Sequence, residues 1–284
     1  MANEQSNVLA FRQWQASRRP PEAPDGFGGF LDAILRATEI ETIWAHLCRF
    51  LESYGVNGIT YGHSPDSRGP DLGTHDDLML LSTLDRDFLT ALVDNGYYRE
   101  SITVNWALRN AGVASWSMTN DEARMPGFTS SEAALEFFAR FGMDAGCTIG
   151  FPTASTRGRA VMALTAEPGL TQDDVDERLT QFSDPLFVAA TVAHRAMAAL
   201  PYLGAKPVLT PRQREVLEWV AEGKTVADIA RIMGLAQPTI EKHLRLAREM
   251  LCVETTAHAV IKATFLNQMF IMPQAGRHDR SKAR

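Results

Sequence analysis

Polar and cationic residues recur on one side of a potential helix near the C-terminus. Between residues 236 and 251, apolar side chains stand at positions 240, 244, 247, 250 and 251, which is the spacing of a single buried helix face. The opposite face then presents amide, hydroxyl and cationic groups. Such groups hydrogen-bond to base edges and pair with phosphates when a helix lies in the major groove of DNA. The spacing therefore predicts a DNA contact surface.

We expect eight residues of this helix and of the segments beside it to contact DNA: Arg212, Lys224, Gln237, Thr239, Glu241, Lys242, Arg245 and Arg248. Base-edge contacts are expected from Gln237, Thr239 and Lys242, phosphate or guanine contacts from Arg245 and Arg248, and flanking backbone contacts from Lys224 and Arg212. Phosphates repel Glu241 unless its carboxylate accepts from a cytosine amino group. Taken alone, the charge pattern also fits a cationic face that is merely solvated.

Two further helices must hold this face in place. Thr210-Pro211 predicts a helix start and Gly223 its end. A second helix is expected from Thr225 to Met233, and Gly234 separates it from the third. Two helices joined by a short turn that contains glycine are typical of a helix-turn-helix, so the caps and the turn favour DNA contact over a solvated face.

The charge distribution separates this segment from the rest of the chain. Residues 207–284 hold 12 Lys and Arg against 8 Asp and Glu, a net charge of +4, whereas residues 1–206 have a net charge of −10. The first lysine of the chain is Lys206. A cationic segment joined to an acidic one suits a polyanionic partner for the cationic segment alone.

Residues 209–251 resemble the DNA-binding domain of the LuxR family of quorum-sensing regulators. The matching residues are Leu209-Thr210-Pro211-Arg212, Glu215-Val216-Leu217, Gly223-Lys224-Thr225, Ile229-Ala230, Thr239-Ile240 and His243. Ala236, Pro238 and Leu244 depart from the family pattern and bear on which bases are read. The resemblance implies a fourth helix, about Thr256–Asn267, that helps to pair two subunits. It therefore implies a homodimer on double-stranded DNA with a two-fold symmetric operator, with RNA polymerase as a further candidate partner.

The segment before this domain mixes helices with neighbouring strands. Helical spacing is expected at 30–54, 85–94, 101–110, 130–140 and 171–200, strands at 58–61, 78–81, 147–151 and 159–166, and a loop at 64–74. The two later strands predict a hairpin. The predicted fold is an α/β sandwich, with helices on a mainly antiparallel sheet, followed by an all-α four-helix helix-turn-helix domain. The expected limits are a flexible extension at 1–24, a ligand-sensing domain at 25–203, a linker at 204–208, the DNA-binding domain at 209–271 and a basic tail at 272–284.

The sensing segment resembles, more diffusely, the acyl-homoserine-lactone-binding domain of the same family. Tyr97, Trp116, Glu136-Phe137-Phe138, Gly142 and Leu164-Thr165-Ala166-Glu167 fall in the order and approximate spacing of that domain. Aromatic and polar residues of this segment are the candidates for a small-molecule pocket: Phe88, Leu92, Tyr97, Tyr98, Glu100, Ser101, Trp106, Trp116, Phe137 and Thr165. For each aromatic residue, ordinary core packing is the competing interpretation.

Three departures from the lactone-binding pattern bear on the ligand. Aligned on Tyr97 and Trp116, the resemblance places Phe88 where the family has a tryptophan that donates to the lactone carbonyl, and Leu92 where it has a tyrosine. Ser101-Ile102 stands where the family has Asp-Pro. A buried ligand amide left without a partner costs about 1–3 kcal/mol. The expected signal is thus an acyl-homoserine lactone or a non-lactone analogue.

Other classes of protein fit the sequence poorly. No HExxH, GxSxG, P-loop or GxGxxG motif occurs, so we expect neither an enzyme nor a cofactor or metal. No apolar run reaches the roughly 18–20 residues of a membrane helix, so a cytoplasmic protein without membrane contact is expected. A phosphoacceptor receiver needs a lysine that residues 1–205 lack. A constitutive DNA-binding regulator, whose first domain serves dimerisation or partner binding, stays as the alternative.

Overall fold

A computed structural model describes residues 26–73, 78–120, 130–201 and 209–271. The chain divides into two compact units after Leu200. The expected N-terminal extension, linker and basic tail lie outside the described residues, and the expected domain limits stay predictions. Each unit is described by itself.

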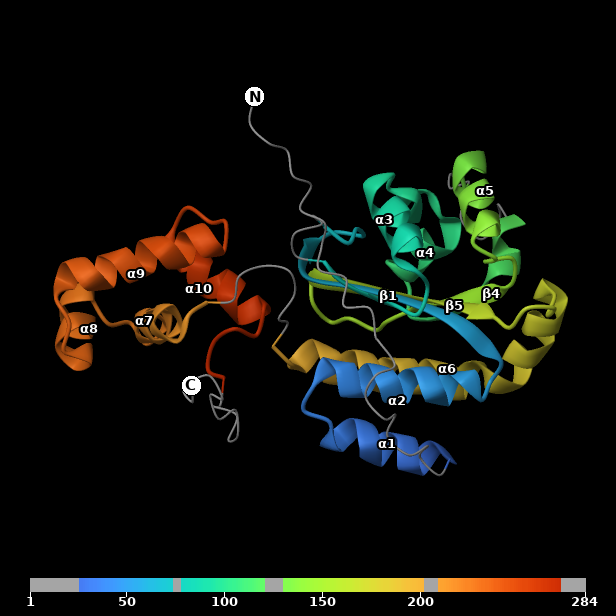
Figure 1. Ribbon diagram of the computed structural model, residues 1–284, viewed down its shortest axis with the longest axis horizontal. Helices are drawn as coiled ribbons and strands as arrows, with labels where there is room; N and C mark the ends of the chain where they lie inside the picture. The colour runs from blue at the N-terminus through green and yellow to red at the C-terminus, as the bar shows by residue number, and fades with distance from the viewer. Residues whose placement is uncertain (1–25, 74–77, 121–129, 202–208, 272–284) are drawn as a thin grey trace, which may run out of the picture. The chain divides into compact units, whose positions relative to one another are not determined.

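The N-terminal unit contains an antiparallel sheet in the order β2-β1-β5-β4-β3 (Figure 1). The strands are β1 Val56–Arg68, β2 Met79–Ser82, β3 Gly112–Ser115, β4 Gly146–Gly150 and β5 Arg157–Ala166. The helices α1 Gly26–Arg36, α2 Ile40–Glu52 and α6 Gln172–Ala199 cover one face, and α3 Arg86–Asp94, α4 Ile102–Ala107 and α5 Glu132–Arg140 cover the other. The sandwich of helices on an antiparallel sheet is confirmed, as is the β4–β5 hairpin.

Strand β1 runs further than the sequence predicted. Residues 64–68 were expected in a loop, because Pro65, Asp66 and Gly69 are turn formers. Instead Ser64 pairs with Arg159 and Arg68 with Arg157, with an irregularity between the two pairs. A bulge of this kind accepts a proline, which cannot donate a ladder hydrogen bond. An ion pair between Asp66 and Arg157 reinforces the extension.

Edge strand β3 was not predicted at all. Its four residues, Gly112 to Ser115, are mostly small and show no alternation strong enough to predict a strand. They become a strand because they pair with β4, from Gly112↔Gly150 to Ser115↔Cys147. The preceding helix α4 ends at Ala107 rather than at Asn110 as expected.

The long helix α6 agrees with its predicted limits. Its 28 residues begin at a capping box of Thr171 and Asp174 and include Pro185. Three alanines and the longer apolar residues Val175, Leu186 and Met197 are buried on the side that packs onto the unit. Within the described parts of the chain, no helix is both long and apolar enough to cross a lipid bilayer.

The C-terminal unit consists of four helices whose limits agree closely with the sequence predictions. These are α7 Pro211–Ala221, α8 Val226–Met233, α9 Gln237–Met250 and α10 Thr256–Phe265 (Figure 1). Their apolar faces share one core, in which Val216, Leu217, Ile229 and Ile240 are fully buried. Thr210 and Gln213 form a capping box at the start of α7.

Candidate DNA interface and ligand pocket

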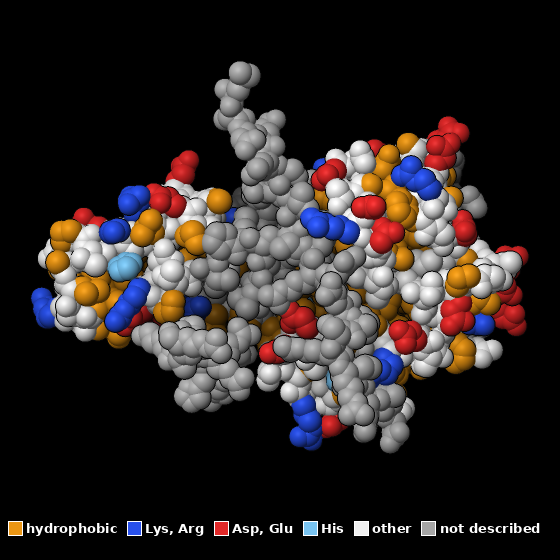
Figure 2. All heavy atoms as spheres, viewed as in Figure 1, with side chains coloured by type: hydrophobic (Ala, Val, Ile, Leu, Met, Phe, Trp, Pro, Cys, Tyr) orange, Lys and Arg blue, Asp and Glu red, His pale blue; other side chains and the backbone are white. Residues whose placement is uncertain are grey.

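The two faces of α9 differ as the apolar spacing predicted. Ile240 and Ala247 are fully buried and Leu244 is 7% exposed. On the other side, Gln237, Glu241, Lys242 and Arg245 are exposed. Figure 2 shows Lys and Arg side chains recurring over the surface of the C-terminal unit. The core of the unit thus fixes which side of α9 is free for a partner.

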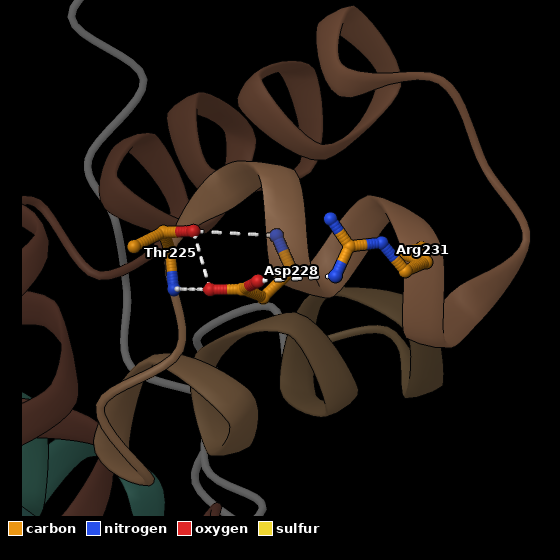
Figure 3. Close-up of polar contacts among 3 residues, drawn as sticks. All are labelled: Thr225, Asp228 and Arg231. Carbon is orange, nitrogen blue, oxygen red and sulfur yellow. Dashed lines mark hydrogen bonds and ion pairs between the residues drawn. The ribbon is translucent and has the colours of Figure 1, made fainter.

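The turn before α9 is held by local hydrogen bonds. Gly234 adopts a left-handed conformation with φ of 65°, and the Leu235 amide donates to the Ala230 carbonyl at 2.9 Å. At the other end of α8, Thr225 and Asp228 cap each other, and Arg231 lies 3.6 Å from the Asp228 carboxylate (Figure 3). The hydrogen bond from the Thr225 hydroxyl lowers the pKa of Asp228. The Gly234 cap thus ends α8 just before α9, and the Thr225–Asp228 box fixes where α8 begins.

Two of the expected phosphate-binding arginines carry exposed ion pairs. Arg245 Nη1 lies 2.6 Å from Glu249 Oε1, and Arg212 Nη1 lies 2.7 Å from Glu215 Oε2. Exposed pairs of this kind contribute little to stability, so a phosphate can replace the carboxylate at small cost. Lys224 is exposed beside the turn that follows α7.

Thr239, His243 and Arg248 lie at the borders of the exposed face. All three are half-buried. Arg248 Nη1 donates to Thr256 Oγ1 of α10 at 3.4 Å. Arg248 therefore links α9 to α10 instead of pointing freely outward with Lys242 and Arg245.

The N-terminal unit has a small apolar cavity between the sheet and the α3–α5 layer. Its volume is about 50 Å³. Three of the expected ligand residues line it, namely Phe88, Leu92 and Tyr98. The Tyr98 hydroxyl is buried and has no hydrogen-bond partner among the described residues, and burial raises its pKa. Tyr98 is therefore a candidate for hydrogen bonding to a ligand in this cavity.

Two other expected ligand residues belong to the aromatic stack behind this cavity. Tyr97 stacks on Phe137 at a centroid distance of 4.4 Å, and Phe137 stacks on Phe88 at 5.4 Å. Phe141 meets both phenylalanines, at 5.2 and 5.1 Å. The stack supports one wall of the cavity and joins α3 to α5.

Trp116 and Ser101 belong to a chain of internal hydrogen bonds. Trp116 Nε1 donates to Thr148 Oγ1 at 2.9 Å, and Thr148 Oγ1 donates to Thr103 Oγ1 at 3.1 Å. Thr103 is in turn 3.2 Å from the Ser101 hydroxyl, which also caps α4. The polar atoms of both residues are therefore already partnered by the protein.

The remaining expected ligand residues lie away from the cavity lining. Glu100 is exposed and accepts a hydrogen bond from Ser131 at the start of α5. Trp106 is half-buried against Ile102 and Ala114. Thr165 is buried in β5, and its hydroxyl has no hydrogen-bond partner among the described residues.

Sequence reasoning missed most of the aliphatic lining of the cavity. Alternate residues of β1 and β5 face it, as does the segment around β2. The unassigned lining residues are Thr60, Gly62, Leu72, Leu78, Leu80, Val93, Val104, Phe138, Met143, Val161 and Ala163. The lining residues of β1 and β5 could have been predicted from the two-residue period of the strands, because every second side chain of a strand points to the same face.

In this chain, a sheet packed between helices is followed by a helix-turn-helix unit. This is the arrangement of a bacterial regulator with two domains. Residues 39–197 match the model of the autoinducer binding domain, and residues 207–263 match that of bacterial regulatory proteins of the luxR family. The chain belongs to the LuxR family. The matched families are regulators and not enzymes.

Individual proteins are similar to parts of this chain. The transcriptional activator protein AnoR of Acinetobacter nosocomialis is 31% identical over 115 residues, which is 39% of this chain and 46% of AnoR. The chain thus spans about half the length of that relative. TraR of Rhizobium radiobacter is 23% identical over 75% of this chain and 85% of its own length. A crystal structure of the N-acylhomoserine lactone dependent factor CepR2 from Burkholderia cenocepacia aligns with a TM-score of 0.48 at 19% identity, covering 60% of this chain and 93% of CepR2.

Proposed function

We propose that the protein is a sequence-specific DNA-binding transcription regulator that responds to a small-molecule signal held in its N-terminal unit. The exposed face of α9 is the observation that supports DNA binding. Gln237, Lys242 and Arg245 lie on it, while Ile240 and Leu244 anchor the opposite face. A helix presented in this way fits the major groove, with amide and cationic groups toward bases and phosphates.

We further propose that the regulator binds as a homodimer to a two-fold symmetric site. Helix α10 supports this, because Ala259 and Ala263 are buried in the core while Ile261, on the outer side, is 49% exposed. An apolar side chain on a short terminal helix suits contact with the same helix of a second copy. Selection from a random-oligonucleotide pool tests the proposal, since a dimer enriches inverted repeats. Enrichment of single half-sites, or of no sequence, would contradict it.

The signal is proposed to occupy the cavity under α3–α5. Small-molecule sites usually measure about 300–1,000 Å³. A cavity of about 50 Å³ therefore has to expand by movement of wall side chains such as Phe88 and Leu92 when a ligand enters. Within this apolar lining, the Tyr98 hydroxyl gives the ligand a hydrogen-bonding partner. These features suit a mostly apolar ligand with few polar atoms, an acyl-homoserine lactone or a non-lactone analogue.

Thermal unfolding of the full chain tests the ligand. The probes are butanoyl-, octanoyl- and dodecanoyl-homoserine lactone, with the ring-opened acids as controls. A ligand at 100 times its dissociation constant stabilises the native state by about 2.7 kcal/mol. A shift with a lactone supports that ligand class. Sequence-specific DNA binding without any shift, from these probes or from cell extract, would favour the constitutive alternative.

A further inference from the structure

A second and much larger cleft lies in the N-terminal unit, apart from the cavity under α3–α5. Its volume is about 620 Å³, within the usual range of small-molecule sites. The turn after α4, the β4–β5 hairpin and the last turns of α6 form its walls. It shares no lining residue with the smaller cavity: His63, Pro70, Ala107, Leu108, Arg109, Asn110, Ala111, Phe151, Pro152, Thr153, Gly158, Arg159, Ala160, His194 and Ala198 line it.

The charge of this cleft favours an anion. Two arginines and no carboxylate are among its lining residues. Arg159 Nη1 donates to the carbonyl oxygens of Gly158 at 2.7 Å and Ser155 at 3.4 Å, which holds the guanidinium in place. Among the described residues, these are the hydrogen bonds that Arg159 makes, and no carboxylate pairs with it, so Nε and Nη2 stay free for a ligand. A guanidinium with free donors is the protein group best suited to a carboxylate or phosphate.

Two neutral imidazoles add further hydrogen-bonding groups. His63 Nδ1 is buried without a partner among the described residues. His194 Nδ1 lies 2.8 Å from the hydroxyl of Tyr61. Burial raises the pKa of Tyr61, so this hydroxyl stays protonated. In the His194 tautomer with its proton on Nε2, Nδ1 accepts from the Tyr61 hydroxyl and Nε2 is a donor for a ligand.

The cleft also has an apolar wall for the body of a ligand. The rings of Phe151 and His194 stack at a centroid distance of 4.4 Å, and Leu108 and Pro70 add aliphatic surface. We propose that this cleft binds a small organic acid, with its anionic group on Arg159 and its hydrocarbon body against Phe151. The site is independent of the signal cavity proposed above.

Binding of 2-naphthoate to the full-length protein tests this assignment. Its fluorescence is titrated, and neutral 2-naphthamide serves as the matched ligand without charge. We expect Arg159→Gln to weaken 2-naphthoate binding about tenfold or more, since a hydrogen bond to a charged group contributes about 1.5–3 kcal/mol. The amide should bind about tenfold more weakly than the acid. Arg86→Gln, which changes an exposed arginine of α3 outside the cleft, should leave the affinity unchanged.

The variant Tyr98→Phe separates the two sites. It alters the smaller cavity alone, so 2-naphthoate affinity should stay at the wild-type value. Loss of affinity in Tyr98→Phe with none in Arg159→Gln would place the acid in the smaller cavity and overturn the proposal. Equal affinities for acid and amide, or no binding up to about 1 mM acid, would also overturn it. None of these results bears on the lactone or DNA tests.

Discussion

The hydroxyl of Tyr61 in strand β1 lies 2.8 Å from Nδ1 of His194 in α6. Tyr61 is fully buried and His194 is half-buried, and the two side chains connect an inner strand of the sheet to the last helix of the N-terminal unit. Tyr61→Phe leaves His194 Nδ1 buried without a partner, and we expect it to destabilise the native state by about 1–3 kcal/mol. Urea unfolding of the full chain followed by tryptophan fluorescence measures the change. An unaltered midpoint would show that the hydrogen bond contributes nothing.

His63 and His194, which are both half-buried, should make stability depend on pH. Burial, reinforced by His63 and Arg195, lowers the pKa of His194 to about 3, and burial lowers the pKa of His63 to about 4. Because these histidines titrate near 6.5 in the unfolded chain, the unfolded state binds protons between pH 6.5 and 4 that the native state does not.

Their contribution to stability is therefore complete above pH 6.5 and decreases as the pH falls toward 4. Each histidine adds a slope of up to about 1.4 kcal/mol per pH unit in that window. In His63→Phe, we expect a shallower slope from pH 6.5 to 4.5 and an unchanged slope from pH 7 to 8. Urea unfolding at a series of pH values gives both. Parallel wild-type and variant curves would refute the assignment.

Removal of cationic groups from the exposed face of α9 should weaken DNA binding. Lys242→Ala and Arg245→Ala are each expected to cost about 1–3 kcal/mol in binding to the selected operator without unfolding the domain. Gel shift at fixed salt measures this. Arg36→Ala is the matched control, because Arg36 and Arg245 are both exposed and both form an i,i+4 pair, with Asp32 and Glu249. Equal losses in all three variants would rule out a specific role for α9.

The unpartnered hydroxyl of Tyr98 leads to two predictions, one for stability without ligand and one for ligand affinity. Tyr98→Phe removes a buried polar atom that no described residue satisfies, so the variant without ligand should be as stable as the wild type or more stable. With a ligand that accepts from this hydroxyl, affinity should fall by about 0.5–1.5 kcal/mol. Thermal unfolding with and without lactone gives both values. A clear loss of stability without ligand would indicate that the hydroxyl has an internal partner.

Gly150 at the end of β4 should not tolerate a side chain. An added Cβ would lie 2.5 Å from the carbonyl oxygen of Ala107 and 2.9 Å from its Cα, and backbone atoms cannot easily move aside. We expect Gly150→Ala to destabilise the unit by about 1–3 kcal/mol. Gly28→Ala is the control, because nothing lies within 4 Å of the added atom. Similar unfolding midpoints for the two variants would contradict the close approach.

The sequence predicted the C-terminal unit more accurately than the sheet, for a physical reason. The limits of α7, α8 and α9 follow from local signals, such as the caps at Thr210 and Thr225 and the left-handed Gly234. Strand β3 and the extension of β1 depend on pairing with residues far along the chain, so no local signal marks them.

For the candidate ligand residues, too, the sequence predicted what local features determine and missed what depends on contacts far along the chain. Phe88 lines the cavity, whereas Trp116 is engaged with Thr148, a partner 32 residues away. Residue type predicted that both belong near the sheet. It could not show which polar atoms the protein itself satisfies, because that depends on the register of β3 against β4 and on the docking of α4.

Strand β1 carries two independent sets of side chains. Thr60 and Gly62 face the small cavity, whereas Tyr61 interacts with α6 and His63 lines the larger cleft. The small cavity and the larger cleft thus lie on opposite faces of β1, and neighbouring residues of this strand line different sites. A substitution at one of these positions can therefore alter one site without altering the other, whereas a single-residue insertion within β1 would exchange the residues that β1 contributes to the two sites.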